Sequence, residues 1–94
     1  MGDDLQFDWD DANTGHLARH GVGPVEAEQA ILDTDALMLE IQEEDEERVK
    51  AVGVTGAGRI LVVVFTLRGD AIRPITAYDA PGRMQKLYLE GKRI

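Results

Sequence analysis

The 94-residue chain contains no cysteine and no serine. Without cysteine, disulfide bonds and thiolate metal sites are excluded, and without serine there is no serine nucleophile. The longest uninterrupted apolar run, residues 60–65, is far too short to span a bilayer. The first residues have neither the basic start nor the apolar stretch of a signal peptide. We therefore expect a cytoplasmic protein that makes no contact with a membrane.

The residues that are present have the composition of a small globular protein. Hydrophobic residues make up 44% of the chain and charged residues 30%, which is ordinary for a soluble domain. A chain of this length suffices for one modest hydrophobic core, and neither a repeat nor a linker interrupts it. We expect residues 1–94 to form a single domain.

Basic residues are nearly absent from the first half of the chain, and acidic residues are few in the second half. Residues 1–47 contain fifteen of the eighteen carboxylates and a single base, Arg19, whereas residues 48–94 contain nine of the ten bases. The net charge of −8 hides this division. Because charge bears on partners rather than on fold, the basic half is expected to suit phosphate. The acidic half would repel phosphate or bind a basic partner.

The hydrophobic pattern changes from helical spacing to alternation and back to helical spacing. Asp10 is placed to N-cap the first helix, Gly21 to end it, and Pro24 to begin the second helix. The expected elements are an extended lead-in or short strand at 7–9, helices over 10–20 and from 24, strands over 36–41, 48–54, 59–67 and 71–78, an acidic turn at 42–47, and a helix from 81 to about 91.

This order predicts an α+β fold with a small antiparallel sheet of about four to five strands, two N-terminal helices and one C-terminal helix. Residues 59–67 are apolar on both faces and suit a central strand. Pro74 cannot donate a ladder hydrogen bond, so it is expected at an edge or a bulge. The last helix is expected to bury the stripe Met84, Leu87 and Tyr88.

Two histidines, His16 and His20, stand four residues apart on one face of the first expected helix. This spacing suits two metal ligands, but the chain has no third histidine and no zincin His-Glu pattern, so we expect no metal site. Two interpretations remain open: polar residues at a helix end, or groups that move protons near neutral pH.

Basic residues gather in the strands and the last helix of the second half, close in sequence to Tyr78. Guanidinium groups bind phosphate in bidentate fashion and would stabilise a pentavalent phosphorane. The alternative is a sheet whose arginines are solvated or paired with carboxylates of the acidic half. The residues concerned are Arg59, Arg68, Arg73, Arg83 and Lys86.

Several segments together resemble the BrnT-type toxins. They read F-D-W-D at 7–10, L-A-R-H-G-V at 17–22, D-E-E-R at 45–48, G-R-I-L-V-V-V at 58–64 and R-G-D-A-I-R-P-I-T-A at 68–77. The resemblance runs through nearly the whole chain in the same order and spacing, and the ordered set is fairly specific.

The resemblance implies a RelE-like fold and a ribonuclease toxin of a type II toxin–antitoxin pair that needs no metal or other cofactor. In such an enzyme the ribose 2′-hydroxyl attacks the adjacent phosphate, while arginines stabilise the phosphorane and a histidine moves protons. The implied partners are RNA and a ribbon-helix-helix antitoxin, with DNA bound only through the antitoxin. By position, the resemblance implies Arg59 and Arg73, then Arg68 and His20, as catalytic candidates and Trp9 as an RNA-binding candidate. The basic cluster adds Arg83 and Lys86 as RNA-binding candidates, and Tyr78, which stands where the family has arginine, would donate a proton or stack on a base. Trp9 would either stack on a base or support the core.

The chain departs from the family pattern near the end of the last strand. Where the family continues S-A-R, residues 76–78 read Thr-Ala-Tyr, so one charge-stabilising arginine is missing. The alternative hypothesis is therefore a catalytically weak or inactive toxin-like module that mainly binds an antitoxin-like partner. Neutralisation of Arg59 and Arg73 by acidic neighbours would favour this alternative.

Overall fold

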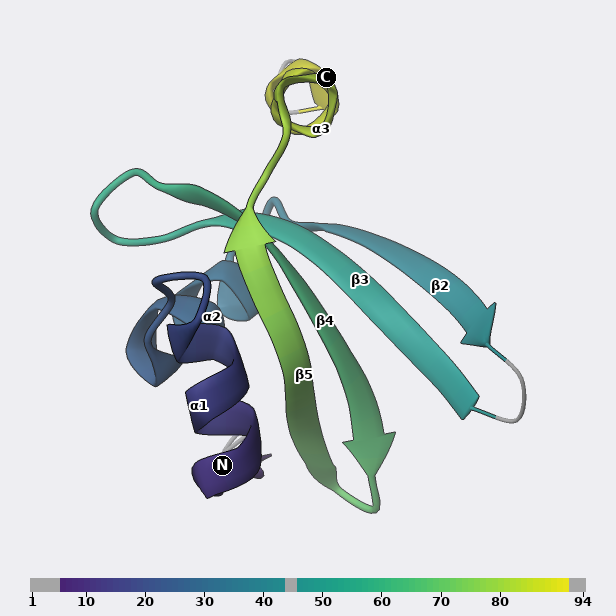
Figure 1. Cartoon of the computed structure of the whole chain (residues 1–94). Coiled ribbons are helices and arrows are strands. Elements are labelled where there is room, and N and C mark those ends of the chain that lie inside the picture. Colours follow the sequence, from purple (N-terminus) through teal and green to yellow (C-terminus); the bar gives the residue numbers. More distant parts are fainter. Residues whose placement is uncertain (1–5, 44–45, 92–94) are drawn as a thin grey trace.

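The computed structural model describes residues 6–43 and 46–91, in which three helices and one five-stranded sheet form the predicted α+β fold (Figure 1). No helix of these residues is long and apolar enough to cross a membrane. The elements in chain order are β1 (Gln6–Phe7), α1 (Asp11–Ala18), α2 (Pro24–Leu32), β2 (Leu37–Glu43), β3 (Glu46–Val54), β4 (Ile60–Arg68), β5 (Ala71–Asp79) and α3 (Gly82–Gly91).

The sheet has the strand order β1-β5-β4-β3-β2. Strands β2 to β5 form the expected antiparallel meander, because each is joined to the next by a short connection. The two-residue strand β1 pairs with β5 in parallel, which makes the sheet mixed. No hairpin joins this pair, since α1, α2 and strands β2 to β4 lie between β1 and β5 in the sequence.

The starts of both N-terminal helices follow the predicted signals. The Asp10 side chain accepts a hydrogen bond of 3.1 Å from the backbone N–H of Asn13, and the Asn13 side chain accepts one of 2.8 Å from the backbone N–H of Asp10. This reciprocal pair is a capping box. Gly21, with φ of 72°, follows the end of α1, and Pro24 opens α2.

The two faces of the sheet are covered by different helices (Figure 1). Alternate β4 residues, including Leu61 and Phe65, face the core formed with α1 and α2, whereas Val62 and Val64 face Tyr88 of α3. Because β4 is buried on both sides from Leu61 to Phe65, the prediction of a central strand is confirmed.

The last helix buries a narrower stripe than the sequence predicts. Tyr88 is 1% exposed and Met84 packs against the same core, but Leu87 is 54% exposed, so its predicted burial is wrong. The helix packs on one end of the sheet through Met84 and Tyr88, which are four residues apart and share one side of the helix. Leu87 lies beside this contact line. The Tyr88 hydroxyl donates a hydrogen bond to Asp33 Oδ2 at the end of α2.

Pro74 lies at a β-bulge, as one of its two predicted settings requires. Phe65 pairs with Pro74 while the preceding Val64 pairs with Thr76, so Ile75 is the extra residue. The acidic turn predicted over 42–47 is wrong in extent, because β2 and β3 continue to the pair Glu43–Glu46. The remaining connection, residues 44–45, lies outside the described residues.

Candidate active site

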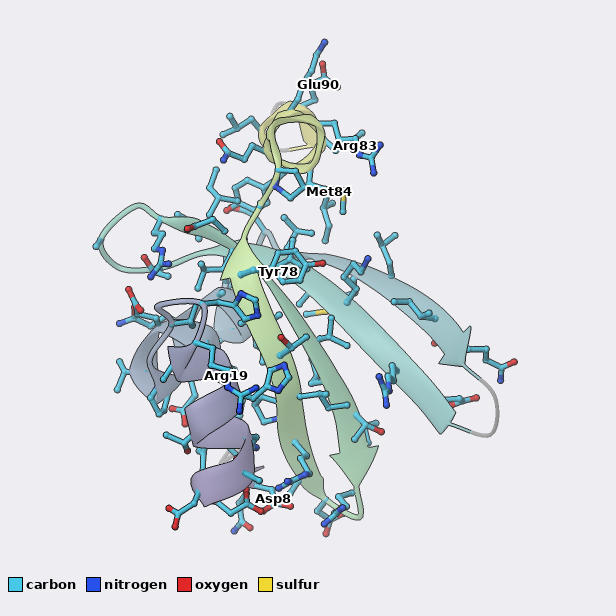
Figure 2. The ribbon with its side chains drawn as sticks, in the orientation of Figure 1. Asp8, Arg19, Tyr78, Arg83, Met84 and Glu90 are labelled. Carbon is cyan, nitrogen blue, oxygen red and sulfur yellow. The ribbon has the colours of Figure 1, made fainter. Side chains whose placement is uncertain are left out.

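Helix α1 lies alongside β5, and the turn after the helix brings His20 to the tyrosine near the end of that strand. The ring centroids of His16 and His20 are 6.1 Å apart, as expected for residues on successive helical turns. The rings of His20 and Tyr78 meet edge to face with centroids 6.3 Å apart. These three residues are called the His–Tyr row. In Figure 2, Tyr78 lies at the α3 end of β5 and Arg19 projects from the end of α1.

A buried asparagine fixes α1 against β5. Asn13 is only 4% exposed, and its Nδ2 donates hydrogen bonds of 2.9 Å to the carbonyl oxygens of Asp8 and Pro74. The bulged β5 backbone is thus bound directly to the first turn of α1. This attachment sets the position of His16 on the helix and of His20 in the turn that follows it.

A small pocket lies beside the first histidine of the row. It has a volume of about 200 Å³ and joins α1 to the bulge of β5. Its lining residues are Ala12, Asn13, His16, Arg73, Pro74 and Ile75. A guanidinium and an imidazole therefore border the same space.

Arg73 is held by two carboxylates that precede α1. Its Nη1 lies 3.1 Å from Asp10 Oδ2 and 3.5 Å from Asp8 Oδ2, and its side chain is 17% exposed. The backbone N–H of Asn13 and then the Arg73 guanidinium lower the pKa of Asp10. Arg68 is much looser, since its side chain is 65% exposed and its Nη1 lies 3.7 Å from Asp8 Oδ2.

Arg59 joins three parts of the fold at the start of β4. Its Nε donates to Asp79 Oδ1 at 2.7 Å, and its Nη1 donates to the Gly21 carbonyl at 2.9 Å and to Glu26 Oε1 at 3.1 Å. Asp79 is the main cause that raises the pKa of Arg59, and the guanidinium in turn lowers the pKa of Asp79. The side chain therefore connects the α1–α2 turn, α2 and the end of β5.

The structure does not bring Arg59 and Arg73 together. Arg73 is opposite Thr66, whereas Arg59 precedes the first residue of β4. Seven residues of strand separate the two positions, or about 23 Å. Of the two alternatives that the sequence left open, the ion-paired arrangement is the one found for both arginines.

The other RNA-binding candidates occupy three different settings. Trp9 packs against the core and its Nε1 donates a 2.8 Å hydrogen bond to Glu28, so it supports the core. Arg83 is exposed on the first turn of α3, on the side that Figure 2 shows above Tyr78. Lys86 lines a pocket of about 390 Å³ formed by α3 residues alone, and no described contact joins it to the His–Tyr row.

Sequence reasoning left out of the candidate site one residue that the structure adds, His16. The spacing of His16 from His20 could be read from the sequence. Only the structure shows that the pair lies against Tyr78 of β5, through the contact of His20 with this tyrosine. The described part of the chain contains no group of three or more His, Asp or Glu residues that could hold a metal ion.

The fold and the site define a small α+β protein with a histidine pair beside a tyrosine and a bordering arginine. Residues 9–83 match the family described as the ribonuclease toxin, BrnT, of type II toxin–antitoxin systems. The match covers most of the chain, and the chain belongs to this family. Membership indicates a ribonuclease toxin whose partner is an antitoxin. No curated protein matches the chain.

Proposed function

We propose that the chain cleaves RNA without a metal ion, by attack of a ribose 2′-hydroxyl on the adjacent phosphate, with the His–Tyr row as the reacting centre. The observation that carries this proposal is the position of His20 between His16 and Tyr78, with His16 lining the pocket that Arg73 borders. Imidazoles change charge near neutral pH and so suit both halves of a proton transfer.

In the proposed reaction His20 takes the proton of the 2′-hydroxyl as this oxygen forms a bond to phosphorus. The bond from phosphorus to the 5′-oxygen breaks, and His16 gives a proton to the leaving oxygen. The products are a 2′,3′-cyclic phosphate and a 5′-hydroxyl. We assign to Arg73 and Arg19 the stabilisation of the negative charge that develops on the phosphorane. Tyr78 is assigned the stacking of a base.

The more distant cations are assigned to the flanking phosphates, because guanidinium and ammonium groups bind the backbone without reading sequence. They are Arg68, Arg83 and Lys86. We assign Arg59 to the stability of the fold, since each of its three nitrogens already donates to one of its three partners. The antitoxin is proposed to be a ribbon-helix-helix protein that carries DNA binding for the pair, because a chain of net charge −8 repels DNA as a whole.

The test is cleavage of a single-stranded RNA oligonucleotide in EDTA by the intact chain and by His16→Asn and His20→Asn variants. Each variant is expected to lose about a hundredfold or more in rate while its thermal unfolding is unchanged, since both side chains are exposed. Asp11→Asn, an exposed change on the same helix, serves as the control and should retain activity. An oligonucleotide with 2′-deoxyribose throughout should remain intact. Equal cleavage of the two oligonucleotides would refute the mechanism.

A second candidate function is a binding module with little or no nuclease activity. The observation that favours it is that carboxylates hold both Arg59 and Arg73, so that phosphate must displace Asp8 and Asp10 to reach Arg73. If the intact chain binds its antitoxin tightly but cleaves none of a set of RNAs, this second function is the correct one.

A further inference from the structure

The helices leave part of their own face of the sheet uncovered, on the side of β2. Figure 1 shows α1 beside β5 and β2 at the far edge of the sheet, and α2 packs on β4 and β3. The register places Met38 and Glu40 of β2, and Leu67 of β4, on this helix-bearing face. Met38 is 49% exposed and Leu67 is 65% exposed, so apolar side chains are left in solvent there.

Glu40 and Leu67 line a hollow of about 340 Å³ on this face. We call it the acidic hollow, and its lining residues are Glu40, Ile41, Gln42, Glu47, Arg48, Val49 and Leu67. The lining contains two glutamates and one arginine, and the two glutamates share the helix-bearing face with Val49 and Leu67, so this face is negative. An element that fills the hollow must therefore combine apolar side chains with positive charge.

The hollow continues into the open edge of the sheet. Strand β2 is the last in the strand order and pairs only with β3 among the described strands. An edge strand presents backbone N–H and C=O groups that an added strand can pair with. Because side chains alternate along a strand, an added strand would send every second side chain over the hollow.

A second copy of this chain is a poor occupant of the edge. Antiparallel pairing of the full length of β2 with itself places Glu40 directly opposite Glu40 of the other copy. Like charges directly opposite each other destabilise a strand pair. A strand that carries lysine or arginine opposite Glu40 gains from the same position.

We propose that an extended, basic segment of the antitoxin docks on the edge of β2 and fills the acidic hollow with alternate apolar and basic side chains. This inference rests on the antitoxin partner that family membership indicates, and not on RNA cleavage. The docking surface lies across the sheet from the His–Tyr row, because β4 and β3 separate β5 from β2. Contacts at this edge therefore anchor the antitoxin without covering the row.

The test compares Leu67→Lys with Val25→Lys, because both side chains are 65% exposed and only Leu67 lines the hollow. Affinity for the antitoxin, taken as the product of the adjoining gene, is measured by calorimetry. Leu67→Lys is expected to weaken binding about tenfold or more, and Val25→Lys to leave it unchanged. Glu40→Lys should also weaken binding, and the loss of affinity should be larger at low salt than at high salt, because the change removes a charge attraction that salt screens.

Amide hydrogen exchange supplies the second measurement and does not depend on a variant. Antitoxin binding is expected to slow exchange along residues 37–43 of the intact chain. Equal effects of Leu67→Lys and Val25→Lys, or unchanged exchange along this strand, would overturn the proposal. Dimerisation of the chain alone that Leu67→Lys abolishes would assign the surface to a second copy and overturn it too. RNA cleavage by Leu67→Lys should equal that of the intact chain, so the two proposals fail separately.

Discussion

Replacing Arg59 with glutamine tests whether its guanidinium stabilises the fold or binds RNA. The change removes the bonds to the Gly21 carbonyl, Glu26 and Asp79, which join four segments of the chain. A hydrogen bond to a charged group contributes about 1.5–3 kcal/mol when buried, whereas an exposed ion pair contributes about 0–1 kcal/mol. The Arg59 side chain is 28% exposed and that of Asp79 is 65% exposed, so the contribution should lie between the buried and the exposed values.

An intermediate loss of about 1.5 kcal/mol in the free energy of unfolding is therefore expected. In a domain of this size such a loss lowers the melting temperature by about 6–12 °C. The assay is thermal unfolding followed by circular dichroism at neutral pH. Arg68→Gln is the matched control, because Arg68 is 65% exposed and its ion pair with a described residue is the loose 3.7 Å contact with Asp8. Its melting temperature should change by little.

The pH dependence gives the same prediction an independent check. Arg59 lowers the pKa of Asp79, so the stabilisation by this carboxylate is present above its ordinary pKa of 3.8 and is lost as the pH falls through the lower folded value. The difference in stability between the intact chain and Arg59→Gln should shrink below about pH 4. Unchanged stability together with a hundredfold loss of RNA cleavage would refute this reasoning and make Arg59 a phosphate contact.

Two further predictions concern the packing of the helices. In Gly53→Ala the new Cβ would lie 2.0 Å from a backbone oxygen of α2, so chemical denaturation should show a loss of about 2 kcal/mol or more. Gly15→Ala meets open space in α1 and should instead gain about 0.5–1 kcal/mol; equal effects of the two changes would contradict the packing of α2 on β3. Tyr88→Phe removes the hydroxyl that donates to the carboxylate at the end of α2 and should lose about 1–3 kcal/mol in the same measurement. An unchanged midpoint for Tyr88→Phe would show that α3 is held by apolar packing alone.

The parts of the fold that were predicted correctly depend on local physics. The N-cap at Asp10, the opening of α2 at Pro24 and the bulge at Pro74 follow from hydrogen-bonding groups that each residue has or lacks. The burial of Leu87 was predicted wrongly, because a helical stripe does not reveal how much of it a sheet will cover. The acidic composition of residues 42–47 likewise indicated a turn, although strand pairing continues to Glu43 and Glu46.

The site could be predicted only in its components. The spacing of His16 and His20 was readable, but the contact of His20 with Tyr78 joins residues nearly sixty positions apart. The partners of Arg59 and Arg73 depend on which carboxylates of the acidic half reach them when the chain folds. Composition cannot make that choice, because the first half contains fifteen carboxylates.

Folding removes much of the charge division along the chain and leaves a different one across the sheet. Arginines of the basic half form ion pairs with Asp8, Asp10 and Glu26 of the acidic half. The pairing neutralises the repulsion of these carboxylates for RNA phosphates. Carboxylates of β2 and β3 remain around the acidic hollow at one edge, while the His–Tyr row lies at the other. An antitoxin anchored at β2 must therefore extend across the molecule to shield the row. Anchoring and neutralisation should then depend on different segments of the antitoxin and be separable by truncating it.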